Sequence, residues 1–173
     1  MPNFLNTFAV GFRALALLCL CAGAAQAEAL PKPTGPILLS VTGAIGVTNA
    51  EGGATFDLAM LEAIGKTTTV TSTAWTEGES TFEGVLLSDL MERVGATGTT
   101  AVAVALNDYK VDIPAEDFTN YPVILAYRMD GDLLKIRDKG PLWIVYPQDD
   151  FPDLKTKQTQ AKWVWQVKEI RFR

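Results

Sequence analysis

The sequence predicts an α+β domain with small mixed β-sheets and a few short helices. Three observations support this class. Apolar runs of strand length recur along the chain, two stretches have apolar residues at helical spacing before a glycine, and an Asp-Gly pair separates two β-prone runs. About 145 residues follow the N-terminal segment, the length of one domain. We therefore expect a single domain over residues 37–173.

In the first half of that domain, two strands and two helices are expected in alternation. Ile37–Thr42 is an apolar, β-prone run, and Lys66–Trp75 is dominated by threonine and valine, which favour a pleated surface over a helix. Phe56–Ile64 and Leu86–Val94 have the helical pattern, and each is followed by a glycine that can end a helix.

The elements expected in the second half are strands. Asp130-Gly131 is a hairpin signal between two of them. In the last strand the apolar residues change from odd-numbered to even-numbered positions, which predicts a bulge near Lys168. The continuously apolar strand that opens this half is expected to be central and covered on both faces. The predicted strands are Ala101–Leu106, Tyr109–Ile113, Val123–Met129, Leu133–Ile136, Leu142–Tyr146 and Trp163–Phe172.

The N-terminus has the pattern of a secretory signal peptide. A short segment with one positive charge, Arg13, precedes the apolar run 14–22, and Ala25-Gln26-Ala27 is a small-x-small cleavage signal. The run is too short to span a bilayer stably. We expect residues 1–27 to be removed, residues 28–36 to form a Pro-rich extended lead-in, and the product to be periplasmic without membrane insertion.

Composition excludes most familiar catalytic groups from the mature chain. The two cysteines, Cys19 and Cys21, both lie in the predicted leader, and the sequence has no histidine. Thiolate nucleophiles, imidazole bases and His/Cys metal sites are therefore absent after cleavage, and no catalytic or metal-ligating residue is assigned. Cleavage would leave 14 basic against 20 acidic residues, and this balance argues against nucleic acid as a partner.

Two local groupings each have two interpretations. Three aspartates in the segment 149–153 could bind a hard cation, but they lack the spacing of a calcium loop, so a solvated turn is favoured. Trp143, Trp163 and Trp165 could line a ligand pocket, but large aromatic residues at alternating positions favour a core role.

The order of several blocks resembles one known family. The blocks are Trp75–Gly78, Phe82–Met91, Ala105–Tyr109 with Ile113-Pro114, Ala126–Gly131, Arg137–Pro147 and Lys162–Phe172. Through them most of the mature chain resembles the oxidoreductase molybdopterin-binding domain family, which has the sulfite oxidase-like fold. The likeness is to a compact, exported, single-domain branch of that family.

The resemblance implies a specific ligand position. Catalytic relatives hold molybdenum through a cysteine shortly before the tryptophan that matches Trp75, whereas this chain has Thr71-Ser72-Thr73-Ala74 there. A hydroxyl stays protonated at neutral pH and is a poorer partner for this metal than a thiolate. The leader also lacks the Arg-Arg pair through which folded, loaded enzymes are exported. Molybdopterin is the cofactor that the resemblance implies, but we expect none to be bound.

The functional prediction is a periplasmic, cofactor-less binding, sensory or accessory module, with catalysis left open. Its partner would be a small polar or anionic ligand or a membrane-bound signalling or redox protein. The alternative is an oxidoreductase that binds molybdopterin without a cysteine ligand. A hydrolase that uses Ser72 or a threonine has no base to activate the hydroxyl. The predicted ligand-binding residues are Thr71, Ser72, Thr73, Trp75, Asn107, Tyr109, Arg128 and Tyr146.

The cleavage signal gives a first testable prediction: the mature protein begins at Glu28 and carries no lipid. Bulky Leu18 and Leu20 precede the two cysteines, where a lipoprotein signal has a small residue. The intact mass of the exported protein measures both properties. A diacylglycerol adduct on either cysteine would contradict the prediction.

Overall fold

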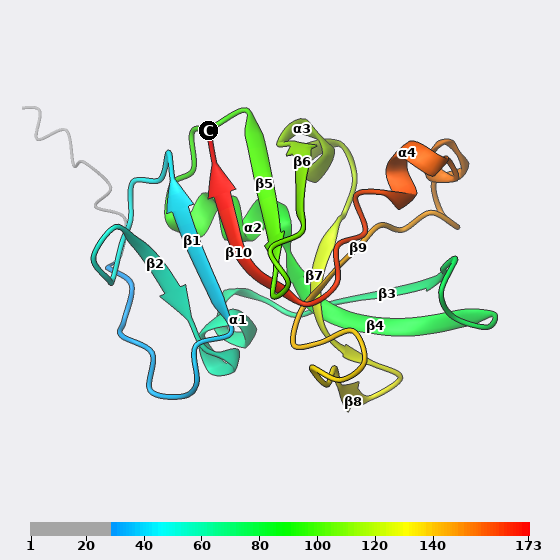
Figure 1. Cartoon of the computed structure of the whole chain (residues 1–173), viewed down its shortest axis with the longest axis horizontal. Coiled ribbons are helices and arrows are strands. Elements are labelled where there is room, and N and C mark those ends of the chain that lie inside the picture. The colour runs from blue at the N-terminus through cyan, green and yellow to red at the C-terminus, as the bar shows by residue number, and fades with distance from the viewer. Residues whose placement is uncertain (1–28) are drawn as a thin grey trace, which may run out of the picture.

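The computed structural model describes residues 29–173, which form two five-stranded sheets with short helices around them (Figure 1). This is the α+β class that the sequence predicts. The predicted signal peptide, with Cys19 and Cys21, lies outside the described residues. Within residues 29–173, no helix combines the length and the apolar character needed to cross a bilayer.

The first sheet has the strand order β2-β1-β10-β5-β6. Its distinctive pairing is parallel: β1 and β10 run side by side with Val41 opposite Ile170, whereas the other neighbours are antiparallel. The first and last strands of the described chain are therefore neighbours, which closes the domain. The strands are β1 (Leu39–Gly43), β2 (Gly53–Phe56), β5 (Thr100–Ala105), β6 (Lys110–Pro114) and β10 (Val167–Phe172).

The second sheet has the order β3-β4-β7, and β7 then pairs with both β8 and β9. All of its pairings are antiparallel, and β3 and β4 form a long ribbon at one side of the molecule (Figure 1). The strands are β3 (Thr67–Ser72), β4 (Glu79–Leu86), β7 (Ile124–Met129), β8 (Asp132–Leu133) and β9 (Trp143–Val145).

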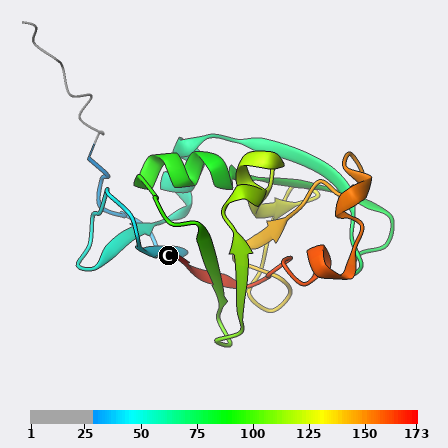
Figure 2. The same cartoon turned by 90° about the horizontal axis from the view of Figure 1, so that it is seen from above.

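Two of the helices pack on the second sheet. Helices α1 and α2 contact β4, and α2 is seen behind β10 and β5 of the first sheet in Figure 1; Figure 2 shows the same arrangement from above. Helix α2 buries Leu87, Leu90 and Val94 and ends at Gly95 in the left-handed conformation, as its sequence pattern predicts. The helices are α1 (Leu58–Ile64), α2 (Leu87–Val94), α3 (Glu116–Asn120) and α4 (Lys157–Gln160), with a 3₁₀ turn at Pro152–Leu154.

The lead-in is attached to the domain through Asp57, the N-cap of α1. The Asp57 carboxylate accepts hydrogen bonds from the backbone N–H groups of Met60 (2.9 Å), Thr34 (2.8 Å) and Gly35 (2.8 Å). These backbone donors lower the pKa of Asp57. Leu30 is also buried, so residues 29–36, which contain no helix or strand, are held to the domain at Leu30 and at Thr34-Gly35, while most of the segment is exposed.

Several element predictions need correction at their ends. The first predicted helix begins at Leu58, because Phe56 belongs to β2. The sequence analysis missed the strands β2 and β4 and, in the second half of the chain, the short helices α3 and α4. The strand predicted over Lys66–Trp75 is β3, which ends at Ser72, and Trp75 lies in the following turn. Strand β8 has only two residues, and the last strand begins at Val167 rather than at Trp163.

The bulge predicted near Lys168 is confirmed, since the register of β10 against β5 shifts between Val167 and Glu169. The hairpin around Asp130-Gly131 is confirmed as well, because β7 and β8 pair on either side of it. Strand β5 is buried from Ala101 to Ala105, as its continuous apolar run predicts.

Strand β4 approaches β7 so closely that position 84 has no room for a side chain. A Cβ atom on Gly84 would lie 2.3 Å from the carbonyl oxygen of Leu125 and 2.7 Å from the Cα of Ala126. We expect Gly84→Ala to lower the free energy of unfolding by about 2 kcal/mol or more, because the backbone of either strand must move. Urea denaturation of the purified protein measures this change.

The matched control is Gly46→Ala, where the nearest atom to the new Cβ is the Gly95 carbonyl oxygen at an ordinary 3.6 Å. This substitution should change the free energy of unfolding by no more than about 0.5 kcal/mol. Equal unfolding midpoints for the two variants would contradict the prediction.

Candidate functional site

Four tryptophans from three separate segments meet at one end of the second sheet. Trp75 lies in the turn after β3, Trp143 lies in β9, and Trp163 and Trp165 lie between α4 and β10. The ring centroid of Trp75 lies 5.2 Å from that of Trp165, 6.0 Å from that of Trp163 and 6.2 Å from that of Trp143. We call these four residues the tryptophan cluster. Aromatic pairs at such distances stabilise one another beyond simple burial of apolar area.

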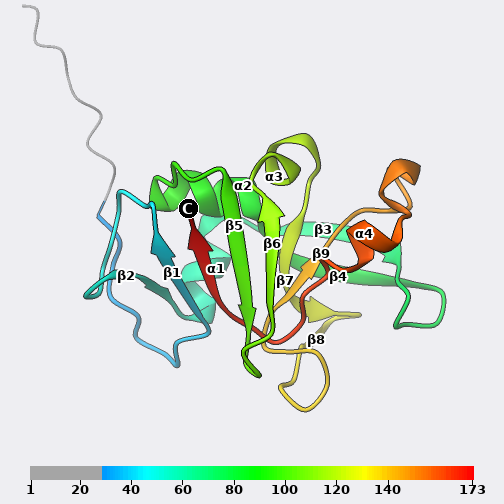
Figure 3. The ribbon, with the colours of Figure 1, turned by 45° about the horizontal axis from the view of Figure 1, so that its top comes forward.

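A cavity of about 310 Å³ opens beside the tryptophan cluster. Its wall combines three of the indole rings with the β5–β6 loop and the end of α4. Figure 3 shows the chain passing from α4 by β9 before it enters β10 beside β5. The lining residues are Trp75, Ala105, Asn107, Tyr109, Gln160, Ala161, Trp163, Val164 and Trp165, and we call this space the tryptophan cavity.

The tryptophan cavity brings together three of the eight predicted ligand-binding residues. Trp75 is 37% exposed and Tyr109 is 54% exposed, so both rings are open to an approaching molecule. The Asn107 side-chain oxygen accepts a hydrogen bond from the Tyr109 backbone N–H (3.1 Å), which fixes the β5–β6 turn. Besides the tyrosine hydroxyl and the indole N–H groups, the lining includes the side-chain amides of Asn107 and Gln160.

The hydroxyls before Trp75 face internal partners. Thr71 is fully buried, with its hydroxyl 3.4 Å from the Asp149 carboxylate, and the Ser72 hydroxyl donates to the same carboxylate at 3.0 Å. The Thr73 hydroxyl accepts a hydrogen bond from the Trp75 backbone N–H (3.0 Å) and bonds to the Thr76 hydroxyl. These contacts position the turn that carries Trp75, and none of the three hydroxyls lines the tryptophan cavity.

Asp149 is the electrostatic centre of that segment. Its carboxylate pairs with the Lys155 ammonium at 2.7 Å and accepts hydrogen bonds from the backbone N–H and the hydroxyl of Ser72. These interactions, led by the bond to Lys155, lower the pKa of Asp149 from 3.8 to about 2. The side-chain amide of Gln148 donates to the Ser72 carbonyl (2.8 Å), so β3 is fixed to the chain after β9.

Tyr146 supports the tryptophan cavity from behind. The residue is fully buried, its ring stacks on Trp163 at 6.3 Å, and its hydroxyl donates to Asp117 at 2.9 Å. Burial, with the nearby Asp117 carboxylate, strongly raises the pKa of this phenol. Lys162 pairs with the same carboxylate at 2.6 Å. Tyr146 is therefore a neutral packing residue in the structure.

Arg128 lies away from the tryptophan cavity. It is opposite Glu83 in the β4–β7 pairing, and its guanidinium is 3.5 Å from the Glu62 carboxylate of α1. It is the cation of the predicted site and the main reason to expect an anionic ligand there. Since the structure does not bring it to the tryptophan cavity, that reason does not apply to the cavity.

The sequence analysis missed several contributors to this site. Gln160, Ala161 and Val164 line the tryptophan cavity, but their sequence positions gave no signal. The preference for a core role is correct for Trp143 and Trp163, which are buried in the core, although Trp163 also lines the cavity. Trp165 is half-buried against the core and lines the cavity as well. The turn expected at residues 149–153 is present and exposes Asp150 and Asp153, whereas Asp149 is partly buried and held in place by the contacts above.

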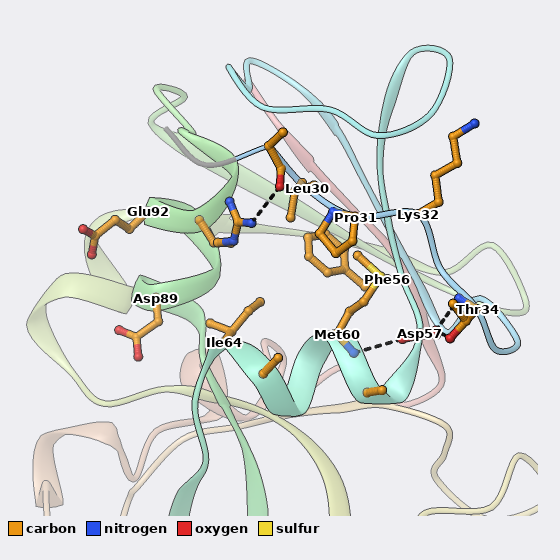
Figure 4. A pocket seen from close by; sticks show the side chains of 14 residues that line it. Leu30, Pro31, Lys32, Thr34, Phe56, Asp57, Met60, Ile64, Asp89 and Glu92 are labelled. Atoms are coloured by element: carbon orange, nitrogen blue, oxygen red, sulfur yellow. Dashed lines mark hydrogen bonds between the residues drawn. The ribbon is translucent and has the colours of Figure 1, made fainter. Parts of the chain in front are cut away.

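A larger groove of about 1240 Å³ lies between the lead-in, α1 and α2 (Figure 4). Phe56, Met60 and Ile64 line it, while the Asp89 and Glu92 side chains point outward from α2. It contains none of the predicted site residues. Across the described residues, no group of three or more acidic side chains is placed to hold a metal ion.

Comparisons with known proteins agree with the sequence resemblance. The model of the family described as the oxidoreductase molybdopterin binding domain matches residues 56–171. No curated protein matches the chain significantly. Among solved structures, the sulfane dehydrogenase SoxCD from Paracoccus pantotrophus matches with a TM-score of 0.59 and 19% identity. The match covers 83% of this chain but only 40% of that one, and at this identity it shows the fold alone.

The Asp149 contacts generate a prediction about stability and pH. A lowered pKa means that the ionised carboxylate stabilises the fold above pH 3.8, and this contribution is lost as the pH falls toward 2. We expect Asp149→Asn to cost about 1 kcal/mol at neutral pH, since the carboxylate remains partly exposed. The cost should shrink as the pH falls through that range. Urea denaturation at a series of pH values measures it, with Asp150→Asn as the matched control. A cost independent of pH would contradict the assignment.

Proposed function

Because the chain belongs to the oxidoreductase molybdopterin-binding domain family, we propose that it uses this fold to bind a small ligand or a partner protein rather than to perform molybdenum chemistry. In this proposal the protein works in the periplasm as a sensory or accessory module. The tryptophan cavity is the binding site. The partner is a membrane-bound signalling or redox protein that responds to whether the cavity holds a ligand.

The observation that carries the proposal is the set of donors in front of Trp75. The resemblance places the molybdenum ligand of catalytic relatives there, and this chain offers Thr71, Ser72 and Thr73. All three hydroxyls have internal hydrogen-bond partners. A hydroxyl that must first lose its proton and then its partner is a poor replacement for a thiolate.

The surroundings of these hydroxyls are also unfavourable for a cofactor that carries a phosphate. The Asp149 carboxylate adjoins the segment, and its low pKa keeps it ionised at neutral pH. Its nearby cation, Lys155, is already paired with it. The residues present at this position therefore do not fit a molybdopterin centre.

The tryptophan cavity has the properties of a small-molecule site. Its volume of about 310 Å³ and its aromatic wall with a few amide groups match the usual composition of ligand pockets. Function is a property of such a site more than of the fold that carries it.

An oxidoreductase that binds molybdopterin without a cysteine ligand remains the second candidate. Membership in the family favours it, because the family model itself extends over residues 56–171. The two candidates differ in one measurable property, the metal and pterin content of the protein after export with its own leader.

We expect the protein exported by a molybdopterin-producing host to contain less than about one molybdenum atom per ten chains, since no thiolate is available at the ligand position. Mass spectrometry of the metal and fluorescence of the oxidised pterin provide the measurements. Thr73→Cys alone should not raise the content to one per chain, because the Asp149 carboxylate and the hydrogen-bonded turn would remain.

A catalytic family member expressed in the same host is the positive control for cofactor supply. Near-stoichiometric molybdenum with pterin in the unaltered protein would contradict the proposal and place the oxidoreductase first.

A further inference from the structure

We propose that the tryptophan cavity selects a cationic ligand of the methylated-ammonium type. This inference rests on the proposed binding function of the same cavity and names the chemistry of its ligand. It departs from the polar or anionic ligand expected from the sequence, because Arg128 is not part of the cavity.

The ring of Trp75 packs at an angle against two other rings that line the tryptophan cavity. The planes of Trp75 and Trp165 meet at 87°, and those of Trp75 and Trp163 meet at 48°. Tyr109 adds a fourth ring from the β5–β6 loop. An aromatic face attracts a cation that lies within about 6 Å of its centroid through the quadrupole of the ring, and sets of several aromatic rings are the sites that recognise quaternary ammonium groups.

The charges of the lining favour a diffuse cation over an anion. None of the described residues that line the tryptophan cavity is charged, so an anionic ligand would find no cationic side chain in the wall. A carboxylate is missing from the wall as well, which disfavours a compact, strongly hydrated cation that needs an ion pair. A methylated ammonium is weakly hydrated at its methyl groups, so contact with aromatic faces compensates well for the water that the cation loses on binding.

The tryptophan cluster already holds one ammonium group of the chain. Lys139 places its Nζ 5.4 Å from the ring centroid of Trp143, and this lysine is half-buried. The excess of acidic residues across the mature chain acts in the same direction, because a negative domain concentrates cations near its surface.

The test compares choline with 3,3-dimethylbutan-1-ol, its uncharged analogue of nearly the same shape. Isothermal titration of the purified mature protein at constant ionic strength gives both affinities. We expect choline to bind with a dissociation constant of about 1 mM or below and the analogue to bind at least about tenfold more weakly. Equal binding of both would overturn the cationic inference while leaving a ligand-binding function in place.

Variants of the exposed ring locate the binding. Tyr109→Leu should weaken choline at least about threefold, whereas Tyr109→Phe, which keeps the ring, should retain most of the affinity. Tyr121→Leu is the matched control, because Tyr121 lies outside the cavity and packs on Phe151. Equal affinity in the two leucine variants would overturn the assignment of choline to this cavity.

Ligand titration and metal analysis measure two separate properties of the protein. Absence of binding by choline and by tetramethylammonium up to about 20 mM would overturn the inference, because three or four aromatic walls should give affinity in that range. The metal and pterin content of the same preparation is measured separately, so it decides on the proposed function whichever ligand binds.

Discussion

The segment between α4 and β10, residues 161–166, hydrogen-bonds through its backbone to both sheets, and the rest of the domain depends on this connection. We call this segment the joint. On one side, the Ile144 backbone N–H donates to the Val164 carbonyl (2.9 Å), which fixes the segment to β9. On the other side, the Leu106 N–H donates to the Gln166 carbonyl (2.8 Å), which fixes it to the end of β5. Strand β10 then continues parallel to β1. Because Trp163 and Trp165 lie within this joint, the cavity is formed by the same hydrogen bonds that close the fold.

The joint also shows what sequence patterns can and cannot predict. The change from odd-numbered to even-numbered apolar positions near Lys168 predicts a bulge, and the structure contains it. One extra residue is needed at this point because the face of the strand that is buried changes from one side to the other. The pattern does not show that the strand begins only at Val167. Gln166 has a φ of 53°, a left-handed conformation unusual for a non-glycine residue, and its side chain donates to the Ile136 carbonyl at 2.6 Å. Such a turn depends on tertiary contacts that local periodicity does not encode.

The candidate site was predictable to the extent that its residues belong to recognisable blocks. Trp75, Asn107 and Tyr109 were identified in that way, and they share one cavity. Arg128 belongs to a block as well, but strand pairing places it opposite Glu83 and near α1. Gln160 lies in a short helix without a strong apolar stripe, so only the three-dimensional arrangement brings it to the wall. Sequence order thus identified the segments, whereas sheet topology decided which of their side chains meet.

The family fold and the site of this chain impose different constraints on function. The fold requires a turn after β3 that carries Trp75, and Thr71, Ser72 and Thr73 satisfy this requirement through internal hydrogen bonds. A metal centre would require one of these positions to give up its partner and supply a strong anionic donor. The aromatic rings next to them need no such change, because they already present polarisable faces in a cavity without charged walls. Binding through the rings therefore uses the structure as it stands, while metal chemistry would have to disrupt the contacts that shape the turn.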